Sequence, residues 1–456
     1  MTGQIIFAVL SIITFGYAAF QFNKIRQNIL LGQEEKIEGD RGQRFKNMFL
    51  VAFGQQKMFK RFVPAIFHLF IYVAFLMTQI ELIEILIDGF TGSHRFFANA
   101  LGGFYNFIIN FIEILSALAF VATFVFLARR NLLKLPRFHK SEMNGWPTLD
   151  GNLILYGEFL LLVGIFSMNG ADMALQAKGE TSYSLNLIIS SNLGPALFGG
   201  LDVHTLHMIE RFGWWLHILV VFGFINYLPK SKHLHIFFAF PNTYFSRLDS
   251  RGKMENMDAI MNEVKSMMDP EAAFDDSGEM EELPVFGSND VTTLSWRNIM
   301  EAYTCTECGR CTSVCPANMT GKKLSPRKVM MDIRDRAEEV GDKIRSGNPE
   351  YISAEAKTED AVLSASNFDD GKSLFDYITK EEIHACTTCN ACVEACPVLI
   401  SPMESILKLR RYELLTESAG PSEWLPMFNS IENNGAVWAM SDARDQWVND
   451  LNKEND

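Results

Sequence analysis

Five apolar stretches constrain the fold of this chain more than any other feature of its sequence. They lie near residues 3–21, 62–87, 105–128, 152–170 and 208–228, with the last helix extending to about 237. Each is close to the roughly 20 residues that an α-helix needs to cross a bilayer. We therefore expect a mainly α fold in which residues 1–240 form a five-helix transmembrane bundle.

Basic residues predict the orientation of this bundle. The 22–61 segment carries nine Lys and Arg residues and the 129–150 segment carries five, whereas the two alternate loops carry only Arg95 and Lys178. Cytoplasmic loops are the ones enriched in Lys and Arg. We therefore expect the N-terminus outside, the residues from Lys230 onward in the cytoplasm, and a multi-pass location in a bacterial inner (cytoplasmic) membrane. The first helix lacks a cleavage pattern and should be retained.

Composition changes abruptly near residue 240. Residues 1–240 contain 19 Lys and Arg against 15 Asp and Glu, and the remaining residues contain 22 against 39. All eight cysteines lie in the second part, and eight of the nine histidines lie in the first. This sorting excludes a single soluble core, a disordered chain and a basic nucleic-acid binder. We expect an acidic linker at 241–292, helical over 254–268, then a cytoplasmic α-helical domain at 293–415 and a tail at 416–456 that contacts a partner.

Two cysteine runs carry the clearest chemical signal in the chain. They are Cys305-x-x-Cys308-x-x-Cys311-x-x-x-Cys315-Pro316 and Cys386-x-x-Cys389-x-x-Cys392-x-x-x-Cys396-Pro397. This spacing is typical of a pair of [4Fe–4S] clusters, in which the fourth cysteine of each run ligates the other cluster. The predicted ligand sets are Cys305, Cys308, Cys311 and Cys396 for one cluster, and Cys386, Cys389, Cys392 and Cys315 for the other. Zinc is the competing interpretation.

The segments around the two runs repeat as well. A mostly helical segment precedes each run, at 293–304 and 373–384. Ser325-Pro326 should open a helix over 326–340 that Gly341 ends, and Ser401-Pro402 should open one over 402–415. We therefore expect a pseudo-twofold dicluster ferredoxin domain.

Histidines in the apolar stretches require an explanation, because a polar ring in lipid is costly. His68 lies at a shallow depth in the second helix, and His217 and His235 are 18 residues apart, five helical turns or about 27 Å. On one continuous helix they would share a face and could ligate two haems at different depths, although Pro229 lies between them. The alternative is hydrogen bonding between helices.

The first part of the chain resembles the cytochrome b (gamma) subunit of respiratory nitrate reductase and the membrane subunits of heterodisulfide reductase. The resemblance rests on Phe67-His68, on Trp215-Leu216-His217 and on the segment 228–236. It implies that His68 and His235 ligate a haem b on the cytoplasmic side and that His217 ligates a deeper one. The second ligand of that deeper haem would fall at Thr78 in this chain, so the sequence leaves one or two haems open.

Carboxylates also occur in or near the apolar stretches, and ionisable groups there suggest a function such as a proton relay. Solvated interface residues are the interpretation that we favour at this stage. The residues are Glu81, Glu84, Glu113, Glu158 and Glu210.

The second part resembles the dicluster ferredoxin subunit of heterodisulfide reductase and the iron–sulfur subunits of glycolate, lactate and glycerol-3-phosphate oxidoreductases. The cysteine runs and Ser325-Pro326 carry this resemblance, and the segment 433–438 looks like a Gly-Asn-Pro-Trp stretch of fused relatives. In many of those relatives a domain with Cys-Cys-Gly motifs follows. This sequence ends at Asp456 without further cysteines, so we expect such a domain on a separate subunit.

Together these features predict a membrane-anchored electron-transfer subunit that connects a cytoplasmic redox partner with menaquinone or ubiquinone. The resemblances imply an electron-transfer flavoprotein, a hydroxyacid oxidase or a thiol/disulfide enzyme as partner, with the direction of flow open. We find no catalytic residues and no dinucleotide fingerprint, so a separate chain should convert the substrate. The alternative is a membrane-tethered iron–sulfur sensor or scaffold; a transporter finds little support.

Overall fold

The computed structural model describes residues 1–254, 256–268, 285–358, 360–438 and 445–454. These residues form helices, and no strand occurs among them. They divide into two compact units. The first comprises residues 1–254 and 290–405, and the second comprises residues 255–289 and 406–456.

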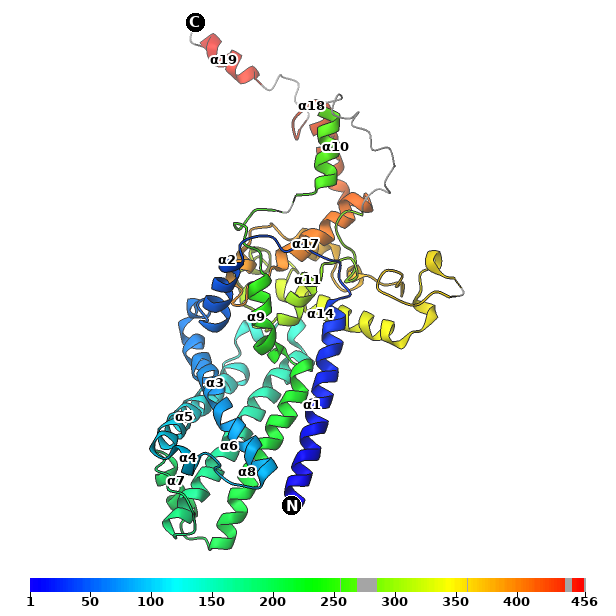
Figure 1. The fold of residues 1–456 in the computed structure, drawn as a ribbon. Helices are drawn as coiled ribbons and strands as arrows, with labels where there is room; N and C mark the ends of the chain where they lie inside the picture. The colour runs from blue at the N-terminus through cyan, green and yellow to red at the C-terminus, as the bar shows by residue number, and fades with distance from the viewer. Residues whose placement is uncertain (255, 269–284, 359, 439–444, 455–456) are drawn as a thin grey trace. The chain divides into compact units, whose positions relative to one another are not determined.

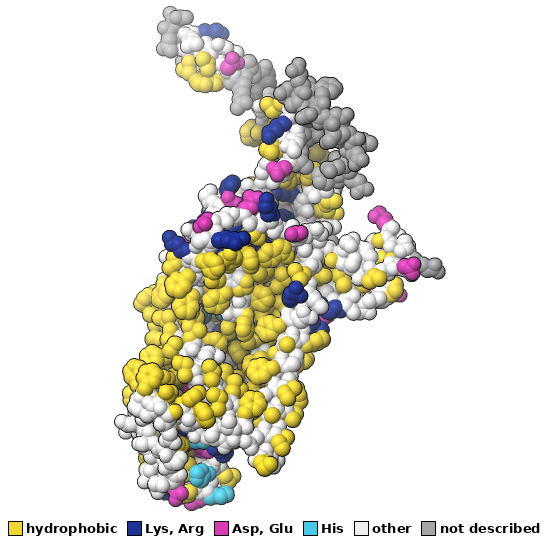
Figure 2. Space-filling model, viewed as in Figure 1, with side chains coloured by type: hydrophobic (Ala, Val, Ile, Leu, Met, Phe, Trp, Pro, Cys, Tyr) yellow, Lys and Arg dark blue, Asp and Glu magenta, His cyan; other side chains and the backbone are white. Residues whose placement is uncertain are grey.

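Five long helices of the first unit run side by side (Figure 1). Each is long and apolar enough to cross a membrane, as the sequence predicts. Hydrophobic side chains cover the visible face of this bundle, and Lys and Arg side chains gather along one edge of that surface (Figure 2). The helices are α1 (Thr2–Ile29), α3 (Phe62–Thr91), α5 (Gly103–Asn131), α6 (Trp146–Ala177) and α8 (Val203–Tyr227).

We call the end of the bundle where α1 and α5 end, and where α3 and α6 begin, the cluster end. The opposite end, where α8 begins, is the distal end. Short helices and turns lie at each of these two ends. The cluster end has α2 (Arg41–Asn47), a π-helical turn (Met48–Phe53) and a 3₁₀ turn (Met58–Lys60), and the distal end has α4 (Ala98–Leu101) and α7 (Ser190–Phe198).

The fifth helix is shorter than the sequence predicts. α8 ends at Tyr227, and two 3₁₀ turns, Leu228–Lys230 and Lys232–Leu234, lead into α9 (His235–Phe245). Pro229 has no backbone N–H to donate, so an α-helix cannot continue through it without losing a hydrogen bond. The expectation of one helix over 208–237 is therefore wrong, and His217 and His235 do not share a face of one helix.

The cysteine runs lie among short helices at the cluster end. α12 (Arg310–Val314) and α16 (Ala391–Ala395) are the matching elements of the two runs and pack together. The surrounding helices are α11 (Trp296–Thr304), α13 (Pro316–Met319), α14 (Pro326–Ser346), α15 (Lys380–His384) and α17 (Pro402–Arg411).

Two predicted helix ends differ from the observed ones. Ser325 caps α14 by accepting a hydrogen bond from the N–H of Lys328, as expected, but the helix runs to Ser346 and ends at Gly347 with φ 65°. Gly341 lies inside the helix, where α1 passes close to it and Asn28 fills the space that a Cβ would need. The 373–384 segment is a 3₁₀ turn (Leu374–Asp376) followed by α15 rather than one helix.

The second unit contains α10 (Asp258–Met268), α18 (Leu425–Asn434) and α19 (Gln446–Glu454). The predicted 254–268 helix thus begins at Asp258. α17 continues into a π-helical turn, Tyr412–Thr416. The hydroxyl of Thr416 accepts a hydrogen bond from the backbone N–H of Phe286 at 3.0 Å. The acidic residues 275–282 of the expected linker lie outside the described residues.

Candidate functional site: cysteine sets beside a histidine-lined cavity

Three cysteines of the first run and the last cysteine of the second run meet in space. Cys305, Cys308, Cys311 and Cys396 line one small cavity. The packing of α12 against α16 brings Cys396 there, although it lies 81 residues after Cys315 in the sequence. This is the grouping that the cysteine spacing predicts.

The other four cysteines form the second group. Burial raises the pKa of the Cys392 thiol to about 12, and the nearby Cys386, Cys315 and Cys389 contribute to that rise. Cys389 is exposed, whereas Cys315 and Cys392 are buried. Buried thiolates this close together repel one another unless a positively charged group lies between them. Bound iron would provide that charge and keep the thiols deprotonated.

The backbone has the same conformation at matching positions of the two runs. Glu307 and Thr388 have φ of 51° and 54°, and the next pair, Gly309 and Asn390, have φ of 68° and 60°. Such left-handed residues turn the chain sharply after each first cysteine, so that successive thiols can point to one centre. Backbone N–H groups also face sulfur: that of Ile400 lies 3.3 Å from Sγ of Cys396. This environment fits iron–sulfur clusters, whose sulfurs commonly accept such hydrogen bonds.

A buried ion-pair network joins the first cysteine loop to the membrane bundle. Oε2 of Glu307 lies 2.5 Å from Nζ of Lys232, and Oε1 lies 2.8 Å from Nη1 of Arg334. Burial raises the pKa of Glu307, but the two cations outweigh it and hold the pKa below its usual value. Lys232 also donates to the carbonyl of Pro147 at 2.6 Å. The network positions the loop between Cys305 and Cys308 on the bundle. Sequence analysis missed it, because Glu307 is one of the residues between the cysteines of the motif and Lys232 lies far from it in the sequence.

Further hydrogen bonds attach the cysteine segments to the bundle. Nδ2 of Asn242 donates to the carbonyl of Val398, next to the second Cys-Pro turn, at 2.8 Å. Nη1 of Arg327 donates to the carbonyl of Arg137 at 2.7 Å. Because donors and acceptors come from both sides, the two cysteine groups and the bundle form one packed assembly within the first unit.

A cavity of about 280 Å³ lies between the cysteines and the bundle interior. His68, His233 and His235 line it together with Cys308 of the first group. Its wall also carries a set of cationic side chains: Arg129, Arg130, Arg137, Arg310 and Lys232. A largely apolar cavity with imidazoles and several cations is suited to an apolar ligand that carries acidic groups.

Two of these histidines are oriented in the same way. Nδ1 of His68 lies 3.0 Å from Oε1 of Gln55, and Nδ1 of His235 lies 3.0 Å from the carbonyl oxygen of Lys232. Since both acceptors are oxygens, each ring carries its proton on Nδ1 and leaves Nε2 as a lone-pair donor. Histidine ligands of metals are commonly held in this manner. The residues therefore fit a haem iron held by two histidines.

His217 lies elsewhere. It is buried, with Nδ1 3.4 Å from the carbonyl oxygen of Leu161 on α6. It is not among the residues that line the cavity of His68 and His235. Thr78, at the position of the expected partner ligand, donates to the carbonyl of Phe75 within its own helix. The structure thus brings His68 and His235 together but places His217 apart from them.

Comparison with known proteins identifies the cysteine segment. Residues 304–400 match the family described as the 4Fe-4S dicluster domain. The chain therefore combines a dicluster iron–sulfur segment with five helices that are long and apolar enough to cross a membrane, and the match argues against zinc.

Similarity to curated proteins extends over nearly the whole chain. It is 29% identical over 458 residues to the "Probable iron-sulfur-binding oxidoreductase FadF" of Bacillus subtilis, covering 96% of this chain and 60% of that protein. It is 26% identical to the "EtfAB:quinone oxidoreductase" of Syntrophomonas wolfei, covering 97% of this chain and 59% of that protein. A "Probable membrane-anchored ferredoxin" of Chromohalobacter salexigens is 30% identical over 141 residues, which are 30% of this chain and 20% of that protein.

The chain thus spans about 60% of the length of the first two relatives. No solved structure is significantly similar to it.

Proposed function

We propose that this chain passes electrons between a soluble flavoprotein and membrane quinone, through two [4Fe–4S] clusters and a haem b. The observation that carries the proposal is the single cavity lined by Cys308 and by His68 and His235. It adjoins one cysteine group and reaches into the helical bundle. A redox group in it would lie between the iron–sulfur domain and the membrane interior.

The residues that would hold each group follow from their chemistry. Cys305, Cys308, Cys311 and Cys396 would ligate one cluster, and Cys386, Cys389, Cys392 and Cys315 the other. Nε2 of His68 and of His235 would hold the haem iron, and the cationic side chains of the cavity wall would neutralise the acidic groups of the haem. These cofactors carry single electrons, and the protein positions them and excludes water.

Electrons would enter at the second cysteine group. Its Cys389 is exposed, whereas Cys305 and Cys396 of the first group are buried. The relative named EtfAB:quinone oxidoreductase makes an electron-transfer flavoprotein the donor that we favour. The Lys and Arg residues of the 22–61 and 129–150 segments support a cytoplasmic position for the iron–sulfur domain, because cytoplasmic loops are enriched in these residues.

The test begins with the purified full chain. We expect about eight non-haem irons and, in a reduced-minus-oxidised visible spectrum, the bands of a b-type haem. His68→Ala and His235→Ala should each lose this haem while keeping the iron, and the exposed His139→Ala serves as the matched control. Reduced electron-transfer flavoprotein should then reduce a menaquinone analogue with the wild type and not with the two histidine variants.

Two outcomes would contradict the proposal. Eight irons without haem would leave a membrane-tethered ferredoxin. Intact haem and clusters without quinone reduction by any flavoprotein donor would exclude quinone as the acceptor. The haem content also decides the role of His217: one haem per chain that survives His217→Ala would remove it from the ligands, and two haems, of which that variant loses one, would establish it.

A further inference from the structure

The carboxylates at the distal end are buried, contrary to the solvated interface residues favoured from the sequence. Glu81 and Glu84 on α3 are each 3% exposed, Glu113 on α5 is 1% exposed and Glu210 on α8 is 2% exposed. Only Glu158 is partly exposed. Burying a carboxylate is costly unless it is hydrogen-bonded or paired with a positive charge. Each of these groups therefore needs a partner.

Backbone N–H groups satisfy part of this set. Glu84 accepts from the N–H of residue 97 at 2.9 Å, Asp88 from those of residues 95 and 96, and Glu113 from those of residues 189 and 190. All three fix loops to the ends of helices. Their role is structural, and the remaining groups require a separate explanation.

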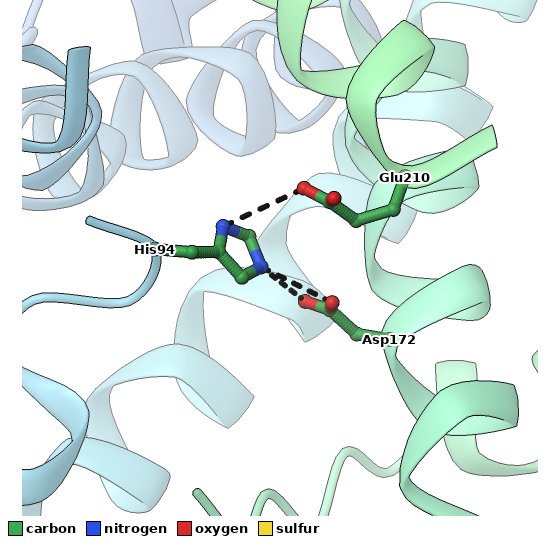
Figure 3. A group of neighbouring side chains, drawn as sticks. All are labelled: His94, Asp172 and Glu210. Carbon is green, nitrogen blue, oxygen red and sulfur yellow. Dashed lines mark hydrogen bonds and ion pairs between the residues drawn. The ribbon is translucent and has the colours of Figure 1, made fainter. Parts of the chain in front are cut away.

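His94 lies between two of the remaining carboxylates (Figure 3). Its Nε2 is 3.1 and 3.2 Å from the two oxygens of Asp172, and its Nδ1 faces Oε1 of Glu210 at 3.5 Å. Neither Nδ1 nor Oε1 has a hydrogen bond to any residue that the structure describes. The Glu210 side chain is only 3% exposed. Two buried polar atoms thus face each other, and neither has a hydrogen-bond partner among the described residues.

Negative charges outnumber positive charges around this pair. Asp172 is held by Arg95, whose Nη2 lies 3.0 Å away, and Tyr183 donates to it at 3.0 Å. Nη1 of Arg95 is also 3.7 Å from Glu81, and Nε of Arg211 is 3.0 Å from the second oxygen of Glu210.

With a neutral His94, three carboxylates therefore face two guanidinium groups. Glu84 and Glu113 act on Glu81 as well and add further negative charge. A proton shared by His94 and Glu210 would reduce this excess, and a metal ion held by His94, Asp172 and Glu210 is the competing occupant that the experiments below distinguish.

We propose that His94 and Glu210 form a proton-binding pair, which takes up and releases one proton between Nδ1 and Oε1. Asp172 is a positioning residue: it accepts from Nε2 and keeps Nδ1 directed at Glu210. The proton exchanges with the surface beside Arg211, whose side chain is 49% exposed.

The role of the pair in turnover rests on the proposed function. A quinone that accepts two electrons from the cofactors also binds two protons, and the pair is one site through which such protons enter the bundle from the distal surface. In the reverse direction it receives them. The proton passes from Nδ1 as the His94 ring changes from imidazolium to neutral imidazole, and it is replaced from the surface.

The first experiment asks only whether the pair binds a proton. Solid-state NMR of the full chain in lipid, labelled with ¹⁵N-histidine, distinguishes imidazolium from neutral rings. We expect an imidazolium signal that disappears in His94→Gln and remains in His207→Gln, which changes an exposed histidine of the same bundle end. This result does not depend on quinone reduction, so it separates failure of the pair from failure of the proposed function.

The second experiment measures turnover. In His94→Ala, quinone reduction should fall by about 10²-fold, the lower range for proton transfer by a positioned side chain, and added imidazole should restore much of it. Ferricyanide reduction, which takes electrons but no protons, should be unchanged. Should His94→Ala fail to bind its clusters, Glu210→Gln replaces it under the same criteria.

Three results would overturn the proposal. The first is a set of imidazolium signals that is identical in the wild type and in His94→Gln. The second is quinone reduction at the wild-type rate in both His94→Ala and Glu210→Gln. The third is a stoichiometric divalent metal in the purified chain that His94→Gln removes.

Discussion

At the scale of single residues, the interleaving of the two cysteine runs determines the chemistry. Each group combines three closely spaced cysteines with one that lies far away in the sequence. In both runs, residues with a left-handed backbone conformation follow the first cysteine at the same two positions. The fourth cysteine therefore links two halves of the domain. Loss of the fourth thiol of one run should therefore affect the cluster that the first three thiols of the other run ligate.

This interleaving predicts a pairing of phenotypes among cysteine variants. Cys396→Ser should remove the same electron paramagnetic resonance signal as Cys305→Ser, and Cys315→Ser the same signal as Cys386→Ser, because each pair shares a cluster. The spectra are recorded on the dithionite-reduced full chain. If Cys396→Ser instead matches Cys386→Ser, each run binds its own cluster and the interleaved assignment is wrong.

At the scale of elements, glycines determine how closely α6 and α8 approach each other. A Cβ at Gly213 would lie 2.7 Å from the carbonyl oxygen of Gly164 and 2.8 Å from the backbone nitrogen of Met168. Backbone atoms cannot rotate away as a side chain can, so the two helices must separate to accept a methyl group. His217 lies one turn beyond Gly213, and its environment depends on this contact.

Gly213→Ala should therefore destabilise the bundle by about 1–3 kcal/mol, the usual cost of overpacking. Gly223→Ala, on the same helix, is the matched control: nothing lies within 4 Å of its Cβ position, and alanine favours a helix. Thermal unfolding of the two variants in detergent gives the comparison. Equal midpoints would show that the α6–α8 contact tolerates a larger separation.

At the scale of the whole molecule, the buried Lys232–Glu307 ion pair and its neighbours hold the first cysteine loop against the cluster end of the bundle. Removing one partner of such a buried pair is costly. The arrangement places one cysteine group beside the histidine cavity and leaves Cys389 of the other group exposed. In the function that we propose, this packing would form the path of electrons from outside the domain to the bundle.

The proposed orientation of this path has a direct test. Alkaline phosphatase inserted after Lys178, in the distal loop, should be active, because it folds only outside the cytoplasm. The same enzyme inserted after Lys140, in the basic loop at the cluster end, should be inactive. A fluorescent protein at the two positions should give the opposite pattern. Activity at both or at the reverse position would contradict the assigned topology.

Much of this protein follows from short-range patterns in its sequence. The five membrane helices follow from apolar length, and the dicluster domain follows from cysteines spaced within a few residues. Such signals are readable because the residues that carry them are neighbours in the chain. Pro229 likewise marked where the last helix could break, although the sequence alone did not show that His235 would begin a new helix.

The tertiary structure decided which distant residues meet. Asn28 of α1 lies against Gly341 inside α14, and the buried Glu307 pairs with Lys232 of a distant segment. His94 lies in a loop that carries no motif. The sequence could show that carboxylates lie near the distal helix ends but not whether water or protein would surround them. The cost of burying a charge, and the partner that offsets it, depend on the helices that become neighbours, and only the folded bundle brings those helices together.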